Sequence, residues 1–174
     1  MRRFIASVVA LLSGTGAIAG TVEDFPTKQI SYRGGLVVFS MPKSWIEEYE
    51  SEGGGTFYER RANAGTLRLN VISARAPRAV TAAQALTNTG SSSVEALGDG
   101  NALAKGVSRT TEQGQPITLF WWHVANVLET DHLRIASFTY TVLGSAELSV
   151  KTASDLSMLE KSVREVRFGP VDSN

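Results

Sequence analysis

Residues 117–129, ITLFWWHVANVLE, place the tightest constraint on the fold. Successive side chains of a strand point to opposite faces, so this segment carries bulky side chains on both faces. A strand of this kind is central in its sheet and is covered on at least part of each side. The residues concerned are Leu119, Trp121 and His123 on one face, and Phe120, Trp122 and Val124 on the other.

Several other segments have strand character. Residues 66–74 alternate apolar and polar side chains, which is typical of a half-buried antiparallel strand. Asp99-Gly100 is a strong hairpin signal, and the segment Gln113-Gly114-Gln115-Pro116 predicts a further turn. The remaining expected strands are 28–32, 36–41 (ended by Pro42), 56–60, 92–97, 101–111 and 133–143, with 44–49 as a turn or short extended piece.

Two segments predict helices. The first covers residues 81–86, with Thr81 as its N-cap and Gly90 as its stop. The second covers residues 152–166 and begins at a Thr-x-x-Asp capping box. Its apolar residues recur at helical spacing and form one stripe against a sheet: Leu156, Leu159, Val163 and Val166. The order of elements along the chain is strands, a helix, about four antiparallel strands and a closing helix. This order indicates an α+β protein with an antiparallel sheet flanked by helices.

The first 19 residues have the pattern of a cleaved signal peptide. Arg2 and Arg3 give a basic start, residues 4–13 form an apolar run, and Ala17-Ile18-Ala19 is a small-residue exit. A retained membrane helix would need about 20 consecutive apolar residues, and polar or small residues interrupt this run. Because no cysteine follows the apolar run, a lipid anchor on a processed N-terminal cysteine is excluded. We expect cleavage after Ala19 and a periplasmic or secreted product without stable membrane insertion.

Removal of the signal leaves about 155 residues, enough for one domain with a sizeable core. We expect this domain to span residues 20–174, with an ordered core of about 28–168. The 17 basic and 17 acidic residues balance, and loss of two arginines gives a net charge of about −2. A near-neutral domain has no electrostatic footprint for nucleic acid or an anionic membrane. The chain contains no cysteine, so disulfides contribute nothing to its stability.

The order of elements resembles the PsbP/Mog family, which includes the DcrB-like periplasmic proteins. Residues 36–45 are similar to the family's strand followed by P-x-x-W, here Pro42 and Trp45. The hairpin over 117–142 and the closing helix over 152–166 extend the likeness. The resemblance implies an antiparallel sheet sandwiched by helices. It also implies a non-enzymatic role as an accessory subunit, binding partner or chaperone-like module, and it carries over no catalytic residues.

The sequence predicts neither a metal nor a cofactor site. His123 and His132 are the only histidines, and a metal site needs three or four converging donors. We expect His123 to be a partly buried strand residue and His132 a turn residue. No G-x-S-x-G motif appears, and Gly53-Gly54-Gly55 lacks the Lys-Ser/Thr that follows a phosphate-binding loop.

An acidic run surrounds two aromatic residues and is the clearest candidate for a partner-binding surface. A solvated loop is the favoured interpretation of the run, because clustered surface charge is common. The functional alternatives are a surface for a basic partner and weak Ca²⁺ ligation. Trp121 and Trp122 must point to opposite faces of a strand, so we expect one in the core and the other in a groove or under a helix. The candidate partner-binding residues are Trp45, Glu47, Glu48, Tyr49, Glu50, Glu52 and Trp122.

These observations predict an exported, soluble binding or accessory protein rather than an enzyme. It would act on another exported protein, as a chaperone-like or immunity-type partner, and its oligomeric state is open. Two alternatives remain. One is an enzyme with a site near His123, and the other is a protein that binds a small apolar ligand between sheet and helix.

Overall fold

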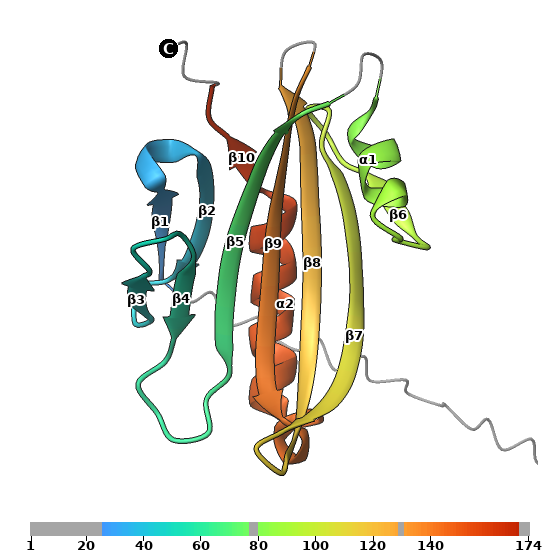
Figure 1. Ribbon diagram of the computed structural model, residues 1–174. Helices are drawn as coiled ribbons and strands as arrows, with labels where there is room; N and C mark the ends of the chain where they lie inside the picture. Colours follow the sequence, from blue (N-terminus) through green and yellow to red (C-terminus); the bar gives the residue numbers. More distant parts are fainter. Residues whose placement is uncertain (1–25, 77–79, 129–130, 171–174) are drawn as a thin grey trace, which may run out of the picture.

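A computed structural model describes residues 26–76, 80–128 and 131–170. A large antiparallel sheet dominates the fold, with a long helix, α2, behind its middle strands and a short helix, α1, near one edge (Figure 1). A smaller sheet lies to the side of the large one. The predicted α+β class with an antiparallel sheet flanked by helices is confirmed. The predicted signal peptide, residues 1–19, lies outside the described residues.

The large sheet has seven antiparallel strands in the order β3-β4-β5-β9-β8-β7-β6. Residues 117–128 of the predicted central strand form most of β8, which pairs with β7 on one side and β9 on the other, as expected of a central strand. The strands are β3 (Ile46–Tyr49), β4 (Gly55–Tyr58), β5 (Thr66–Arg75), β6 (Val94–Ala96), β7 (Ala102–Glu112), β8 (Gln115–Leu128) and β9 (His132–Leu143). His132, which we expected in a turn, is the first residue of β9.

The turn between β7 and β8 is shorter than predicted. Gln113 and Gly114 both have positive φ, 50° and 81°, which fits a two-residue hairpin. Pro116, placed in the turn by the sequence analysis, lies in β8 opposite Thr111. Because residues 102–112 pair with 115–125 without a break, β7 and β8 form one continuous ladder.

The small sheet consists of β1 (Thr27–Tyr32), β2 (Val37–Pro42) and β10 (Arg167–Phe168), with β2 in the middle. The 3-10 turn η1 (Arg33–Gly35) joins β1 to β2. Val37, Phe39 and Met41 of β2 are buried in the main core. Phe39 packs edge-on against Phe138 of β9, with ring centroids 5.2 Å apart. The small sheet and α2 together therefore cover one face of the large sheet.

Helix α1 (Ala82–Asn88) begins as the sequence predicts. The Thr81 hydroxyl accepts a hydrogen bond from the backbone N–H of Gln84 at 3.2 Å, and the Gln84 side chain accepts one from the N–H of Thr81 at 2.9 Å. This reciprocal pair is a capping box.

Helix α2 (Val150–Arg164) begins two residues earlier than predicted. Its N-cap is Ser149, whose hydroxyl accepts from the N–H of Thr152 at 3.1 Å. The predicted capping box at Thr152 and Asp155 is therefore wrong, since both residues lie buried inside the helix. Asp155 instead accepts a hydrogen bond from the buried Tyr140 hydroxyl at 2.8 Å.

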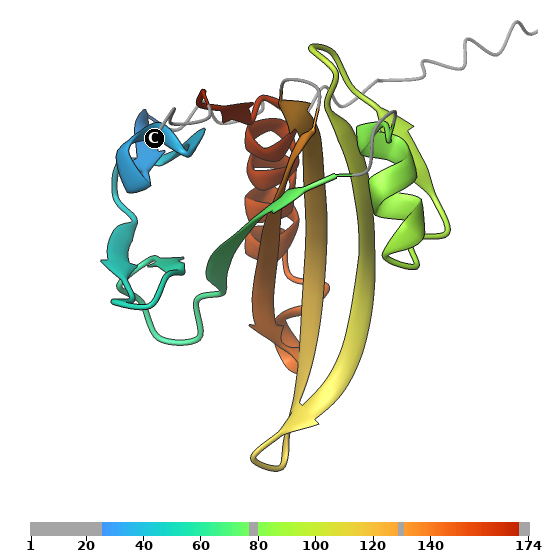
Figure 2. The ribbon, with the colours of Figure 1, turned by 45° about the horizontal axis from the view of Figure 1, so that its top comes forward.

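The two faces of the large sheet differ in how they are covered. The face toward α2 carries the main core, including Leu67, Leu69, Val124, Phe138 and Tyr140. Among the described residues, α1 covers the opposite face at one end only, where Ala82 and Leu86 of the helix pack on alanines of β7 and β8 and on Ile135. In the second view α1 stands beside the upper part of β7, well away from the β7–β8 turn (Figure 2).

Candidate functional site

We call the part of this second face that α1 leaves uncovered the open face. The strand register arranges its residues in rows across β7, β8, β9 and β5. The first row is Ser108, Leu119, Thr141 and Thr66, the second is Gly106, Trp121, Thr139 and Arg68, and the third is His123, Ser137 and Asn70. The third row continues on β7 as Ala104, which is buried beneath α1. Neighbouring strands are about 4.8 Å apart, so each row is a continuous surface.

Trp121 lies flat against β7 because Gly106 has no side chain. A Cβ on Gly106 would fall 2.3 Å from Cζ2 and 2.7 Å from Cε2 of the indole ring. The ring is half-buried, and part of it packs against the α1 cluster. The His123 ring lies 5.0 Å from the Trp121 ring at an interplanar angle of 35°. Together the two rings form an aromatic platform at the centre of the open face.

His123 is half-buried on this platform. Burial lowers the pKa of its imidazole below the usual 6.5, so the ring is neutral at pH 7. Its neighbours in the row are Ala104 and Ser137, and within the described ranges no hydrogen bond joins the His123 imidazole to another residue. The same ranges contain no group of three His, Cys, Asp or Glu side chains that could hold a metal ion.

The rest of the open face combines apolar and polar side chains. Ile72 of β5, in register with Ile135, is 59% exposed. Arg68 and Asn70 are also exposed, whereas Leu119 is half-buried beside Trp121. A row of hydroxyl side chains on β9 runs between the aromatic platform and β5. The surface therefore has an apolar centre and a polar surround.

Two of the four glutamates in the acidic run, Glu47 and Glu48, make hydrogen bonds or ion pairs within the protein. Glu47 accepts from Lys28 and from the Tyr49 hydroxyl, each at 2.6 Å, and these contacts lower the pKa of its carboxyl. Glu48 accepts from the Tyr58 hydroxyl at 2.7 Å. These carboxylates brace the β3–β4 hairpin and are only partly available to a partner.

The remaining members of the run face solvent. Glu50 and Glu52 are exposed, and Tyr49 is 53% exposed with its ring edge-on to Phe57 at 6.0 Å. This tip of the β3–β4 hairpin keeps the combination of negative charge and an accessible aromatic ring that the sequence suggested.

Trp45 cannot serve as a partner-binding residue. It is 4% exposed and stacks on Tyr140, with ring centroids 6.1 Å apart and an interplanar angle of 22°. Its position after Pro42 directs the indole over the large sheet and into the main core. The residue is a core anchor, and the partner-binding assignment is corrected.

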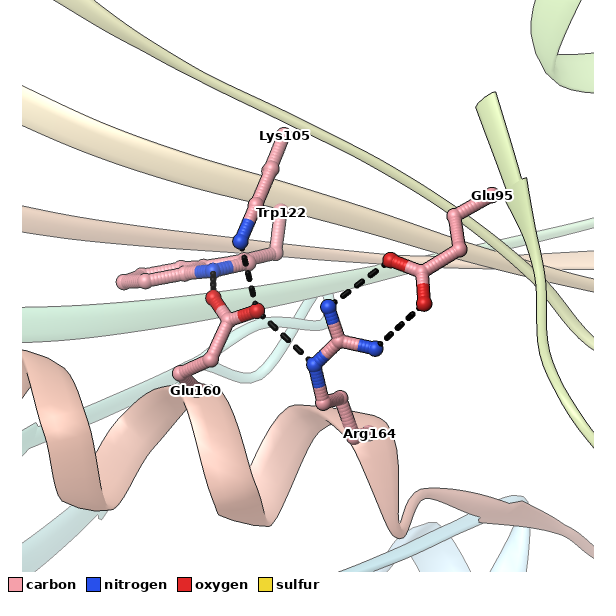
Figure 3. Close-up of polar contacts among 5 residues, drawn as sticks. All are labelled: Glu95, Lys105, Trp122, Glu160 and Arg164. Atoms are coloured by element: carbon pink, nitrogen blue, oxygen red, sulfur yellow. Dashed lines mark hydrogen bonds and ion pairs between the residues drawn. The ribbon is translucent and has the colours of Figure 1, made fainter. Parts of the chain in front are cut away.

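Trp122 is also buried, at 4% exposure, and lies under α2 rather than on a partner surface. Its indole N–H donates to Oε2 of Glu160 at 2.7 Å (Figure 3). Glu160 Oε1 accepts from Lys105 of β7 at 2.7 Å and from Arg164 at 2.9 Å. Burial opposes ionisation of Glu160, yet these three donors keep its pKa below the usual range.

Arg164 extends this network to the edge of the sheet. Its guanidinium makes two hydrogen bonds to Glu95 of β6, at 2.8 and 2.7 Å (Figure 3). The network ties α2 to β6, β7 and β8, and its charges balance within it. We interpret it as a structural clamp rather than as a reactive site.

The sequence predicts that Trp121 and Trp122 point to opposite faces of the strand, but it does not single out Trp121 for binding. One feature of the sequence could have pointed to Trp121. A glycine inside a predicted strand, here Gly106, often marks a close approach of another group to the backbone. In this protein the approaching group is the Trp121 ring.

Comparisons with known proteins give matches of structure alone. No protein-family model and no curated protein matches the chain. A protein from Bacteroides thetaiotaomicron VPI-5482 matches with a TM-score of 0.58 and 18% identity, over 84% of this chain and 50% of that one. This chain thus spans half the length of that protein.

LpqN of Mycobacterium tuberculosis, a protein involved in cell envelope biogenesis, matches with a TM-score of 0.56 and 12% identity, over 83% of this chain and 91% of LpqN. The cyanobacterial PsbP of Synechocystis sp. PCC 6803 matches with 14% identity over 90% of this chain and 100% of PsbP, at a TM-score of only 0.35.

Within the described ranges, no helix combines the length and apolar character needed to cross a membrane. The identities are low, so the likeness concerns the fold and not the activity. The chain therefore has an α+β fold that it shares with LpqN and with the Bacteroides protein.

Proposed function

We propose that the protein is an extracytoplasmic binding protein that recognises another polypeptide through the open face of its large sheet. The observation that carries this proposal is the aromatic platform of Trp121 and His123, together with the 59% exposed Ile72, on a sheet face that α1 covers at one end only. An apolar patch with a polar rim is typical of protein–protein contact surfaces.

Two observations support an extracytoplasmic location. Residues 1–19 have the charge and hydropathy pattern of an export signal. A fold-level relative, LpqN, is involved in cell envelope biogenesis. We propose a periplasmic or secreted accessory role, chaperone-like or immunity-type, with another exported protein as the partner.

Binding is favoured over catalysis by the chemistry around His123. A general base needs a partner that positions it and a group whose proton it removes. His123 has alanine and serine as its row neighbours, and its imidazole is packed against an indole ring. This environment suits a contact residue, and we propose no cofactor for it.

The tip of the β3–β4 hairpin supplies a second contact region for the same function. Glu50, Glu52 and the exposed ring of Tyr49 would attract a basic partner. Surface charges of this kind act mainly on the association rate and are screened by salt. We propose that this region steers the partner while the open face holds it.

The proposal is tested by Ile72→Asp and Arg68→Glu on the open face, with Leu148→Asp as the matched control. Leu148 is 95% exposed and lies between η2 (Gly144–Ala146) and α2, away from the open face. The assays are complementation of a deletion strain and cross-linked capture of partners from the native extracytoplasmic fraction. We expect loss of partner and function with the open-face variants and retention with the control.

Two results would contradict the proposal. One is full retention of partner and function when the open-face residues are changed. The other is loss of function with His123→Gln in a normally folded protein while Ile72→Asp is silent, which would favour an enzyme.

A further inference from the structure

Strand β7 is paired along only part of its outer side. Strand β6 pairs with Ala102, Leu103 and Ala104, and the register ends there. Among the described residues, no strand pairs with 105–112 on that side. Both overall views show the lower half of β7 as the free border of the sheet (Figures 1 and 2).

The hairpins at both ends of β7 show which backbone groups point outward. Glu112 and Gln115 flank the two-residue turn and form its hydrogen-bonded closing pair, so even-numbered residues of β7 point toward β8. At the other end, the carbonyl of Asn101 accepts from the N–H of Leu97, on the β6 side. Odd-numbered residues therefore direct their N–H and C=O groups away from β8.

Three residues of β7 thus present unpaired backbone groups at the edge: Val107, Arg109 and Thr111. No hydrogen bond from elsewhere in the described ranges reaches these groups. The strand is not interrupted by a bulge or a proline, since its pairing with β8 runs unbroken from 102 to 112. An uninterrupted edge of this kind is a template for pairing with another strand.

We propose that this edge of β7 binds an extended segment of another polypeptide, which adds a strand to the sheet. The inference rests on the proposed function, because it assumes that the partner is a polypeptide. Main-chain hydrogen bonds would supply affinity, and side chains of alternate residues would supply specificity.

The side chains along β7 indicate which segment would fit. Val107, 48% exposed, lies on the α2 side of the sheet between Lys105 and Arg109, whose side chains are 51% and 68% exposed. Lys105 contacts the carboxylate of Glu160, and Arg109 contacts that of Glu147. Both basic side chains retain N–H donors that these contacts do not use. An apolar residue flanked by acidic residues, two positions away on either side, would therefore complement this face of the edge.

On the other face of the sheet, the side of the open face, the edge of β7 carries small side chains. Gly106 and Ser108 leave room for the added strand beside the Trp121 ring. A strand bound here would extend the open face rather than cover it. A shorter unpaired run lies on the outer side of β5, beyond its pairing with β4 at Thr66–Leu69, and it gives an internal comparison.

The first test is amide hydrogen exchange of the ¹⁵N-labelled protein, followed by NMR. We expect the amides of Val107, Arg109 and Thr111 to exchange about a hundredfold or more faster than those of Gly106 and the other even residues. Protection of the odd-numbered amides in the free protein would overturn the proposal. Concentration-dependent protection would assign the edge to a second copy of this chain instead.

The second test uses the peptide acetyl-Thr-Glu-Thr-Val-Thr-Glu-Thr-amide as a probe. We expect its chemical-shift changes to map to β7. Methylation of the backbone nitrogens of its valine and glutamates should weaken binding at least about tenfold, because the pairing N–H groups are lost. Equal binding of the methylated peptide, or shifts confined to β5 or to the β3–β4 hairpin, would refute strand addition at β7.

Val107→Pro is the decisive variant, because it removes an outward N–H and spares the ladder with β8. Its matched control is Val107→Thr, which keeps the backbone donor. We expect peptide binding and partner capture to be lost with proline and kept with threonine, while thermal unfolding shows both variants folded. If proline is silent while Ile72→Asp removes the partner, strand addition is refuted and the proposed function stands. If both are silent, the proposed function itself fails.

Discussion

Replacing Gly106 by alanine tests how the aromatic platform is built. The new Cβ would lie 2.3 Å from Cζ2 and 3.1 Å from Cη2 of Trp121. Carbon atoms in contact prefer about 3.5–4.0 Å, so the indole must move by more than about 1 Å. The φ angle of Gly106 is not in the left-handed region, so the conflict is with the side chain and not with the backbone.

The loss of stability caused by Gly106→Ala depends on how far the indole of Trp121 can move away. Inserting a methyl group into a packed region costs about 1–3 kcal/mol, and Trp121 can yield toward solvent because it is half-buried. We expect Gly106→Ala to lower the free energy of unfolding by about 2 kcal/mol. In a Trp121→Ala background the conflict disappears. There the same change should be neutral or stabilise by up to about 1 kcal/mol, because alanine loses less backbone entropy than glycine in a strand.

Urea denaturation of the four proteins in this double-mutant cycle measures the coupling. A favourable coupling of about 2–3 kcal/mol is expected between the two substitutions. Tryptophan fluorescence provides a second readout, since the Trp121 environment should change in the single Gly106→Ala variant. An equal cost of Gly106→Ala in both backgrounds would show that the ring does not lie on β7 at this position.

Three further predictions concern the core, the clamp under α2 and pH. Trp45→Ala should cost about 3–5 kcal/mol in chemical denaturation, whereas a loss below about 1 kcal/mol would place the indole at the surface. Glu160→Ala should cost about 1–3 kcal/mol, because the indole N–H of Trp122 loses its acceptor in a buried site; urea unfolding beside Glu160→Gln, which keeps an acceptor, checks this. Burial lowers the pKa of His123, so the unfolded chain binds its proton more readily and the free energy of unfolding falls as pH drops from above 6.5 toward 5. His123→Gln should remove that part of the decline, and a pH profile identical to that of the unsubstituted protein would refute it.

Sequence patterns of short range predicted much of the fold. The alternation in 66–74, the two bulky faces of 117–129 and the cap at Thr81 depend on neighbours within a few residues, and each is found in the structure. The prediction at Thr152 failed because Ser149, three residues upstream, offered the same cap chemistry. Local chemistry allowed either start for α2, and in the structure the Asp155 carboxylate accepts a hydrogen bond from Tyr140 instead of capping the helix.

The candidate site depended on contacts that the sequence does not reveal. Whether Trp121 or Trp122 is buried depends on which face α2 and the small sheet cover, and that is decided by pairs far apart in the chain, such as Phe39 with Phe138. Trp45 and Trp122 were therefore misassigned to a partner surface, although their aromatic character was evident.

Most strands and helices, and the residues that share a strand face, can be predicted from the sequence, because these properties follow from backbone geometry and near neighbours. Three features depend on long-range packing: α1 is too short to cover its face of the sheet, β6 ends after three paired residues of β7, and Gly106 lies beneath an indole ring. These features arise from the relative lengths and positions of elements brought together by long-range packing, and they create the open face and the free edge on which the proposed binding depends.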